Sequence, residues 1–471
     1  MARGVTLGTC FPPSAKCIDW PLATFFYLEK APTDAQLEDT MRRIISLERL
    51  RSTVVKVGRD KYAWSVLEGM EKRIHEHVTR KEVRSAEELR AEMDALVNSN
   101  LEGKGTRPLW DITVLTLKKG VKWVPAPGGS ETPPPVVCIR VSHAIGDGLS
   151  LVGVLPKLCD GVDGGAVQTL DFKRRALPSP TSIFTSSSSS SFSSVLSSFP
   201  PFKFLAQLFA LVYYLYHCLV AMLAAFATPF GTHDTKTALC DTSKKIANSG
   251  VRRLVISPSF PLADLKEVRA RFGCTVNDVV TACLSGAIQR YQKHFNDPMA
   301  EKRPRIRAAV PYAFPKRPKD CLTNSWTFVT LPLVTGPMDI KERLRKTQQV
   351  CNLMKTTPGA WATNVLNIIS NKLLGFDFQS QTVYDFMSRH SLVFTNVPGP
   401  TAPVMMFGNK VREMGFGIGN LVNQFIAISY AGNLGLSMVL DTDEIKDAHL
   451  IGKFFLEEIN ELRKKPHDDE K

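Results

Sequence analysis

The heptapeptide Ser-His-Ala-Ile-Gly-Asp-Gly, residues 142–148, stands where one sequence pattern gives way to another. An apolar run, Val136 to Val141, ends at it, and an apolar helical spacing starts after it at Leu149. This succession predicts a strand, a tight loop and a helix. A histidine at the end of a strand can present an imidazole that is neutral near pH 7 and takes a proton from a hydroxyl or a thiol. His143 is therefore a candidate catalytic base.

The residues that follow His143 have different expected roles. Asp147 is better placed to fix the loop than to titrate, while Gly146 and Gly148 allow backbone angles that residues with a Cβ resist. His143, Asp147 and Gly148 form the pattern H-x-x-x-D-G, and we take all three as candidate catalytic residues. A lone histidine in such a loop is also often a hydrogen-bonded structural residue. The loop alone leaves both interpretations open.

Composition narrows the class of protein. A chain of 471 residues is long enough for two or three domains, and 44% hydrophobic with 22% charged residues indicates a folded protein. The formal net charge of +14 fits nucleic acid, an anionic membrane surface or a phosphate-bearing small molecule as partner. Lysines and arginines are spread along the chain without interleaved aromatic residues, so we expect no nucleic-acid partner. A generally basic surface remains an equally good explanation.

The ten cysteines are scattered, with no C-x-x-C pair and no His/Cys cluster at zinc spacing. We therefore expect no metal site, reduced thiols and a protein that faces the cytosol. No long apolar core follows the first basic residue, so a secretory signal is not expected.

Residues 1–171 are expected to form an N-terminal half. The capping boxes that begin at Thr33 and Ser85 predict two helices. Strands are predicted at Ser52 to Val57, Tyr62 to Leu67 and Ile112 to Leu117. The breaker-rich stretch Pro125 to Pro135 predicts a surface loop before the His143 strand.

Residues 172–249 are expected to be a linker of two unlike parts. Residues 182–198 are nearly all serine and predict disorder, because they cannot bury enough apolar surface to offset the entropy of folding. Residues 204–230 carry no charge, and as a helix they would extend roughly 40 Å, which is enough to span a bilayer core. Three interpretations are open: a re-entrant or in-plane membrane segment, a true span, and a buried helix.

Residues 250–471 are expected to form a C-terminal half with its own helices and strands. Helices are predicted at Leu262 to Phe272, Val279 to Phe295, Ile340 to Met354 and Ala448 to Leu462. Strands are predicted at Arg252 to Ile256, Ile306 to Val310, Trp326 to Leu331, Ser391 to Asn396, Phe425 to Tyr430 and Leu434 to Leu440. Gly273 is expected to close the first of these helices.

Five motifs in order give the chain a resemblance. They are Pro108-Leu109-Trp110, His143-x-x-x-Asp147-Gly148, Val276-Asn277-Asp278-Val279-Val280, Asn396-Val397-Pro398-Gly399-Pro400 and Ser429-Tyr430-Ala431-Gly432-Asn433-Leu434. Together they resemble the wax ester synthase/diacylglycerol acyltransferase family. The resemblance covers nearly everything except Phe172 to Ser249. Each motif is weak by itself, but five in register are specific.

The resemblance implies an α/β fold with two domains, like that of chloramphenicol acetyltransferase and condensation domains. Mixed sheets with flanking helices would surround a central tunnel with His143 at its middle. It implies acyl-CoA as co-substrate, a long-chain alcohol or diacylglycerol as acceptor, a wax ester or triacylglycerol as product, and no permanently bound cofactor. His143 would be the general base.

Other motif residues have a supporting role by this resemblance. Asn277 and Asp278 would lie near the tunnel or simply cap a helix. Pro108, Leu109 and Trp110 are expected to pack and direct the chain rather than to contact substrate. The family usually has two adjacent histidines, and Ser142 stands here in place of the first, which puts a supporting hydrogen bond and acceptor preference in doubt. The motif Asn396 to Pro400 either lines the CoA entrance or turns the chain.

A single site built by both halves favours the re-entrant or in-plane interpretation of residues 204–230, since one full crossing would separate the halves. That segment would hold the tunnel mouth at a cytosol-facing endoplasmic reticulum membrane or a lipid droplet. Two rivals remain. One is an acyltransferase for soluble acceptors, although the Asp-Phe-Gly-Trp-Gly run of plant secondary-metabolite acyltransferases is absent here. The other is a catalytically silent membrane-docked protein.

Overall fold

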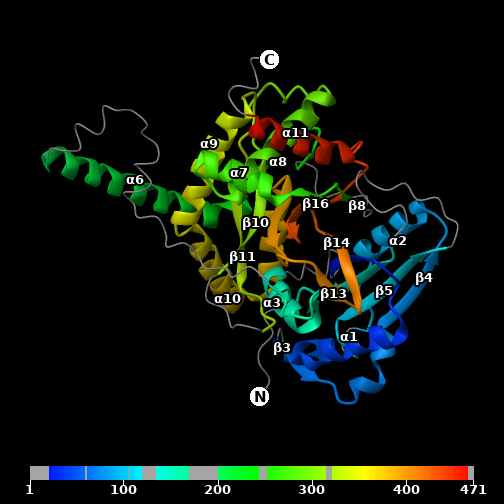
Figure 1. Ribbon diagram of the computed structural model, residues 1–471. Coiled ribbons are helices and arrows are strands. Elements are labelled where there is room, and N and C mark those ends of the chain that lie inside the picture. The colour runs from blue at the N-terminus through cyan, green and yellow to red at the C-terminus, as the bar shows by residue number, and fades with distance from the viewer. Residues whose placement is uncertain are drawn as a thin grey trace.

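Two mixed sheets form the body of the protein. The computed structural model describes residues 21–58, 61–103, 106–118, 134–168, 200–242, 252–314 and 321–464. The predicted serine-rich linker and most of the predicted loop before the His143 strand lie outside these residues. Within them, the two sheets lie next to each other and helices cover their outer faces (Figure 1). The α/β fold class is therefore confirmed.

The first sheet combines strands from both ends of the chain. Its order is β4 (Val78–Val83), β5 (Trp110–Leu117), β6 (Val136–Val141), β1 (Leu22–Leu28), β14 (Asn409–Ile418), β13 (Val404–Met406) and β7 (Asp160–Gly161). β1 pairs antiparallel with β6 on one side and with β14 on the other. Strands from the C-terminal half thus complete the sheet of the N-terminal half, and the sheets do not divide at residue 250.

The second sheet belongs to the C-terminal half. Its order is β11 (Trp326–Pro332), β10 (Arg307–Ala313), β12 (Leu392–Pro398), β15 (Asn423–Tyr430), β16 (Asn433–Leu440) and β8 (Arg253–Ile256), with β9 (Phe260–Pro261) also paired to β16. β15 and β16 form a hairpin whose turn residues, Ala431 and Gly432, both have positive φ. Two positive φ angles in a two-residue turn match the twist of the strands that they join. A separate hairpin is made by β2 (Ser52–Gly58) and β3 (Lys61–Val66).

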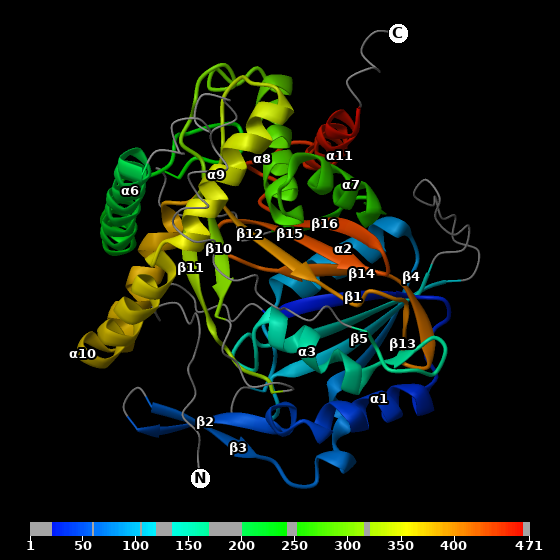
Figure 2. The same cartoon turned by 60° about the vertical axis from the view of Figure 1, so that its left-hand side comes forward.

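The helices pack on these sheets or extend from them. They are α1 (Asp34–Ser46), α2 (Ala86–Asn98), α3 (Gly148–Leu158), α6 (Pro200–Ala227), α7 (Leu262–Phe272), α8 (Val276–His294), α9 (Ile340–Thr356), α10 (Gly359–Ser388) and α11 (His449–Arg463). Short 3-10 turns are η1 (Glu48–Arg51), η2 (Met70–Lys72), η3 (Ile74–His77) and η4 (Thr228–Phe230). Figure 2 shows α7, α8, α9 and α11 on one side of the C-terminal sheet.

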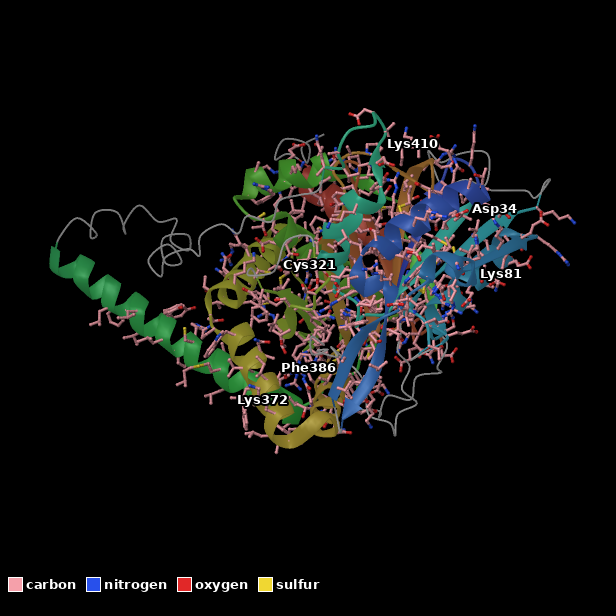
Figure 3. The ribbon with its side chains drawn as sticks, turned by 90° about the horizontal axis from the view of Figure 1, so that it is seen from below. Asp34, Lys81, Cys321, Lys372, Phe386 and Lys410 are labelled. Carbon is pink, nitrogen blue, oxygen red and sulfur yellow. The ribbon has the colours of Figure 1, made fainter. Side chains whose placement is uncertain are left out.

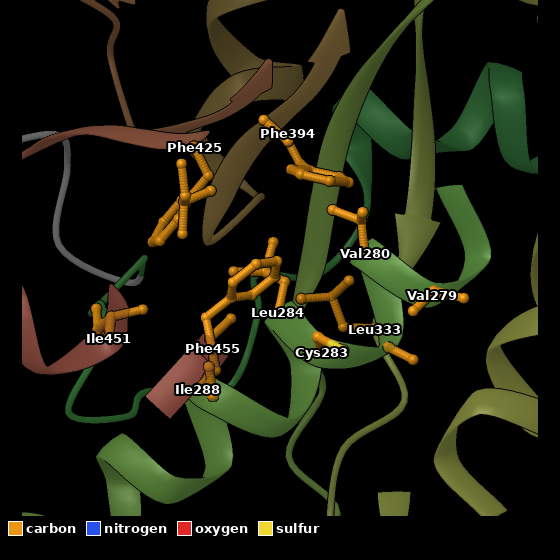
Figure 4. Packing of buried hydrophobic residues seen from close by; sticks show 14 of the residues in the cluster. Val279, Val280, Cys283, Leu284, Ile288, Leu333, Phe394, Phe425, Ile451 and Phe455 are labelled. Carbon is orange, nitrogen blue, oxygen red and sulfur yellow. The ribbon is translucent and has the colours of Figure 1, made fainter. Parts of the chain in front are cut away.

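The C-terminal core forms around α8. Val280, Leu284 and Ile288 of this helix are buried and pack with Phe394 and Phe425 of the sheet and with α11 (Figure 4). Buried aliphatic and aromatic side chains of this size each contribute about 1.5–3 kcal/mol by leaving water. This cluster, whose members lie between Leu239 and Leu462, packs on the sheet behind the site.

Residues 204–230 are not a buried helix, so that alternative is wrong. They lie in α6 and η4, and the apolar stretch Leu211–Phe230 has a hydropathy of 1.7 with only 6% of it buried. Figure 1 shows α6 extending away from the body. By length and composition this helix could cross a membrane.

Candidate functional site

An apolar cavity of about 370 Å³ lies between the two sheets. Its wall includes strands β1, β6 and β14 of the first sheet, strands β10, β11, β12 and β15 of the second, and helix α3. His143 lies on this wall together with Trp110, Trp326 and Phe328. Cavities of this size lined by apolar side chains and a few polar groups are the usual form of a small-molecule site. The predicted tunnel corresponds to this cavity.

The His143 loop joins β6 to α3, as the sequence predicts. Ser142 is fully buried, its N–H donates to the carbonyl of Leu109 at 2.9 Å, and its Oγ accepts from the N–H of Ala144 at 3.3 Å. A small hydroxyl side chain thus closes the turn in front of His143. The His143 ring lies 5.3 Å, centre to centre, from that of Trp326, which is contributed by the other sheet.

A segment of the C-terminal half holds this loop in place. The Nδ2 of Asn324 donates to the carbonyls of His143 at 2.8 Å and Ala144 at 3.2 Å. The indole N–H of Trp326 donates to the Oδ1 of Asn324 at 3.3 Å. The backbone of the histidine is therefore positioned by a side chain that lies 181 residues away in sequence.

Asp147 organises the loop, as expected. Its Oδ1 accepts from the N–H of Ser150 at 2.9 Å, which caps α3, and its Oδ2 accepts from the N–H of Ser325 at 3.0 Å. Its own N–H donates to the carbonyl of Thr323 at 3.1 Å. Asp147 is buried, and it joins the two halves beside His143. Its predicted direct role in catalysis stays a prediction.

Neither loop glycine requires a backbone angle that only glycine adopts, so that part of the prediction is wrong. Neither Gly146 nor Gly148 has a positive φ. A Cβ at Gly146 would lie 2.6 Å from the Oγ of Ser150, which is too close, whereas a Cβ at Gly148 would lie 3.8 Å from Val397. Gly148 lines the cavity, and a side chain there would narrow it.

The motif Pro108-Leu109-Trp110 packs against the site. The indole N–H of Trp110 donates to the carbonyl of Leu50 at 2.6 Å, and its ring stacks on His77 at 4.2 Å. Trp110 is buried, lines the cavity and leads into β5. The packing interpretation of this motif fits these contacts, and Trp110 in addition forms part of the wall.

Asn277 and Asp278 lie at the start of α8, and their contacts indicate different roles. Asp278 forms a capping box with Thr275 and an ion pair with Lys355 at 3.1 Å. The Oδ1 of Asn277 accepts from the Nδ2 of Asn396 at 3.2 Å. Asn396 lines the cavity, and Asn277 is held behind it. Capping therefore accounts for Asp278, and Asn277 reaches the site through Asn396.

The motif Asn396 to Pro400 turns the chain and also contributes to the cavity wall, while its position at a CoA entrance stays a prediction. Asn396 and Val397 line the cavity. Gly399 then turns the chain, with its N–H donating to the carbonyl of Ser429 at 2.8 Å. A Cβ at Gly399 would lie 2.5 Å from that carbonyl oxygen, so only glycine fits.

Several polar residues of the wall were not predicted from the sequence. The Nδ2 of Asn420 donates to Gln424 at 3.1 Å, and the Nε2 of Gln424 donates to Thr395 at 3.2 Å. All three line the cavity, and Asn420 and Gln424 are buried. An Asn or Gln side chain within an otherwise apolar strand sequence is the signal that could have identified them, because a buried amide needs hydrogen-bond partners. Asn324 carries no comparable signal, because its role depends on tertiary contact.

Within the described part of the chain, no group of three or more His, Cys, Asp or Glu side chains could hold a metal ion. Two buried cysteines stay protonated at neutral pH. Burial raises the pKa of the Cys159 thiol to about 12 and that of the Cys351 thiol to about 12. A thiolate is the nucleophilic form of cysteine, so these residues pack rather than react.

Two mixed sheets that enclose an apolar cavity, with a histidine on the loop between strand and helix, define the class of two-domain α/β acyltransferase folds. The chain belongs to the wax ester synthase/diacylglycerol acyltransferase family. The model of the wax ester synthase/diacylglycerol acyltransferase catalytic domain matches residues 30–280, and that of the WS/DGAT C-terminal domain matches residues 322–463.

Solved structures place the fold in the same group. The wax ester synthase/diacylglycerol acyltransferase from Marinobacter aquaeolei VT8 aligns with a TM-score of 0.56 at 17% identity, covering 97% of this chain and 95% of that one. The first condensation domain of the CDA synthetase aligns with a TM-score of 0.54 at 11% identity, covering 95% and 91%. The expected two-domain acyltransferase fold is confirmed.

Among relatives, wax ester synthase/diacylglycerol acyltransferase 2 of Arabidopsis thaliana is 21% identical over 382 residues, which is 75% of this chain and 72% of the relative. Two putative diacyglycerol O-acyltransferases from Mycobacterium tuberculosis align over a shorter stretch: each is 25% identical over 208 residues, and the chain spans 43% of the length of each.

Proposed function

We propose that this protein transfers a long-chain acyl group from acyl-CoA to the hydroxyl of a fatty alcohol or a diacylglycerol, forming a wax ester or a triacylglycerol. The carrying observation is the position of His143 on an apolar cavity that both sheets enclose. Names of relatives that include both activities support the same pair of acceptors. No permanently bound cofactor is required, because a thioester is already activated.

In the proposed reaction His143 takes the proton of the acceptor hydroxyl as the oxygen attacks the thioester carbon. The carbon–sulfur bond then breaks, and the imidazolium returns the proton to the departing CoA thiolate. A positioned base contributes about 10²- to 10⁴-fold to such a reaction. Asn324 and Asp147 hold the loop so that the imidazole faces the cavity.

The apolar wall suits both lipid substrates. Phe26, Leu50, Trp110 and Phe328 offer no charge to an alkyl chain, and burial of each methylene is worth about 0.8 kcal/mol. Asn396 supplies an amide on the same wall, and its second N–H is available to donate to a developing oxyanion.

The same proposal places the protein on a cytosol-facing endoplasmic reticulum membrane or a lipid droplet. Its support is α6, whose apolar side chains are exposed over most of its described length, together with the basic net charge of +14. Acceptors that dissolve in lipid would then meet the cavity at a lipid surface.

The deciding experiment incubates purified protein with a labelled acyl-CoA and hexadecanol, a diacylglycerol or a soluble alcohol. We expect ester with one or both lipid acceptors, and loss of about 10²-fold or more in rate for His143→Ala. His449→Ala, which removes an exposed histidine at the start of α11, is the matched control and should behave like the parent. Product only with the soluble alcohol, or equal rates for parent and His143→Ala, would overturn the proposal.

A further inference from the structure

Helix α10 exposes apolar side chains that the sequence did not single out. Between Gly359 and Phe376 its only charged residue is Lys372. Leu373 is 76% exposed and Trp361 is 62% exposed. The large exposed apolar residues of this helix are Trp361, Ile368, Ile369, Leu373, Leu374 and Phe378. Contiguous exposed apolar surface of this kind marks an interaction site.

The exposed side chains of α10 continue those of α6. The hydroxyl of Tyr214 on α6 donates to the carbonyl of Thr356 just before α10 at 3.2 Å. A Cβ at Gly359, the first residue of α10, would lie 3.4 Å from the Cβ of Ala221. Figure 3 shows α6 leaving the body beside α10, near Lys372. The two helices therefore present one surface.

We infer that α6 and α10 together form a single docking surface for a phospholipid bilayer, which we call the two-helix surface. The inference rests on the proposed function, whose acceptors are lipids. Outside its contacts with the body, α6 exposes large apolar side chains from Leu208 to Phe226 and extends away from the body (Figure 1), and a lipid phase covers this whole stretch at once. A second copy of the chain would cover only the side that it touches.

The two-helix surface also carries exposed aromatic residues that suit a membrane interface. Tyr213, Tyr216 and Trp361 are exposed, and such amphipathic rings prefer the level of the lipid headgroups. Lys372 stands beside Leu373, so its alkyl chain can lie along the lipid while its ammonium group reaches the headgroups. A net charge of +14 adds attraction to anionic lipids.

Strand pairing between segments before and after α6 excludes a single crossing of the bilayer by this helix. β1 precedes α6 in the chain and β14 follows it, yet the two strands pair over Leu22 to Leu28. After α6, Asp234 is fully buried and pairs with Arg307 of β10 at 2.6 Å. Both halves thus lie on one side of the bilayer, and α6 enters one leaflet or lies along it.

The two-helix surface leads to the cavity through α10 itself. Near the end of this helix Met387 lines the cavity, and Phe386 stacks on Phe328 of β11 with ring centres 6.0 Å apart. One helix therefore carries an exposed lipid-facing stretch and then a stretch of cavity wall. This arrangement holds the cavity next to the phase in which acceptor and product dissolve.

The test measures co-flotation of the full-length protein with vesicles of phosphatidylcholine and phosphatidylserine. The variant Leu373→Glu/Leu374→Glu should bind about tenfold or more weakly, because two apolar side chains no longer enter the lipid. The matched control, Val57→Glu/Val66→Glu, places two charges at exposed apolar positions on the β2–β3 hairpin and should float like the parent. Thermal unfolding midpoints identify any variant that is misfolded.

A second pair, Leu215→Glu/Leu219→Glu, makes the equivalent change on α6 and should weaken flotation further when combined with the first. Flotation of the α10 variant at the parent level would overturn the inference, as would a parent that does not bind vesicles. A fall in oligomer size in the α10 variant, with flotation unchanged, would instead assign the surface to a second copy. Flotation does not require acyl transfer, so failure of the proposed function is measured separately.

Discussion

A single amide from the C-terminal half positions the proposed catalytic base. Asn324 donates to two successive carbonyls of the His143 loop and accepts from Trp326, whose ring faces His143. Asn324 does not line the cavity. Its effect on the reaction would therefore pass through the histidine.

We predict that Asn324→Ala lowers kcat about tenfold and leaves KM for acyl-CoA nearly unchanged. Each lost hydrogen bond is worth about 1 kcal/mol, and a small displacement of a base is felt mainly in the chemical step. Steady-state kinetics measure both constants. Asn433→Ala, which removes an exposed asparagine at the start of β16, is the control. A rise in KM with kcat intact would assign Asn324 to substrate binding instead.

At the scale of elements, the sequence predicted those whose signals are local. The capping box at Thr33 and the helix Leu262–Phe272, with Gly273 at φ 60° after it, agree with the structure. Helix α10 was missed because its apolar residues face both the protein and the exterior, so no single face stands out. β14 was missed because its glycines weaken the strand pattern. A Cβ at Gly417 would lie 2.6 Å from Val97, so close packing there demands glycine.

The candidate site likewise has one part that local sequence predicts and one part that depends on long-range contacts. The His143 loop could be predicted because a strand, loop and helix follow one another in sequence. The contacts of Asn324 and of Asn396 join residues more than 100 positions apart, and no local pattern encodes such pairs. Only tertiary structure brings them together.

The C-terminal end of α10 depends on a neutral buried histidine. Burial lowers the pKa of His390 to about 4, against a hydrogen bond to the carbonyl of Phe386 that acts in the opposite direction. The ring also contacts the hydroxyl of Thr330 on β11 at 2.9 Å. Because the folded pKa lies below the ordinary value of 6.5, the unfolded chain binds more protons between pH 4 and 6.5.

We therefore predict that His390 contributes to acid destabilisation. Its contribution is complete above about pH 6.5 and is lost as the pH falls toward 4, a change of about 3 kcal/mol. Urea unfolding at a series of pH values measures it. In His390→Gln the free energy of unfolding should fall less steeply over this window, while the exposed-residue variant His449→Gln should follow the parent. Equal slopes in all three proteins would contradict the prediction.

At the scale of the whole molecule, the pairing of β1 with β14 restricts membrane topology. A chain that entered a bilayer through α6 and emerged on the far side could not return β14 to β1. Contacts between α2 and β8 also keep both halves on one side of the membrane. The amide of Asn98, at the end of α2, donates to the carbonyl of Arg252, just before β8, at 2.6 Å. Both ends of the described chain belong to one body on one side of the membrane.

Epitope tags at the two termini of the full-length protein should accordingly behave alike in sealed microsomes. Protease added from outside should remove both tags without detergent, while a luminal marker stays intact. This outcome follows from sheet pairing and does not depend on whether α6 lies along the leaflet or dips into it, because either arrangement returns the chain to its starting side.

Protection of one tag alone would contradict this prediction, because the bilayer would then have to pass between β1 and β14. Breaking that pair would expose the backbone groups of two central strands, each of which costs several kcal/mol to leave unsatisfied in lipid. Such a result would therefore contradict the fold as well as the topology.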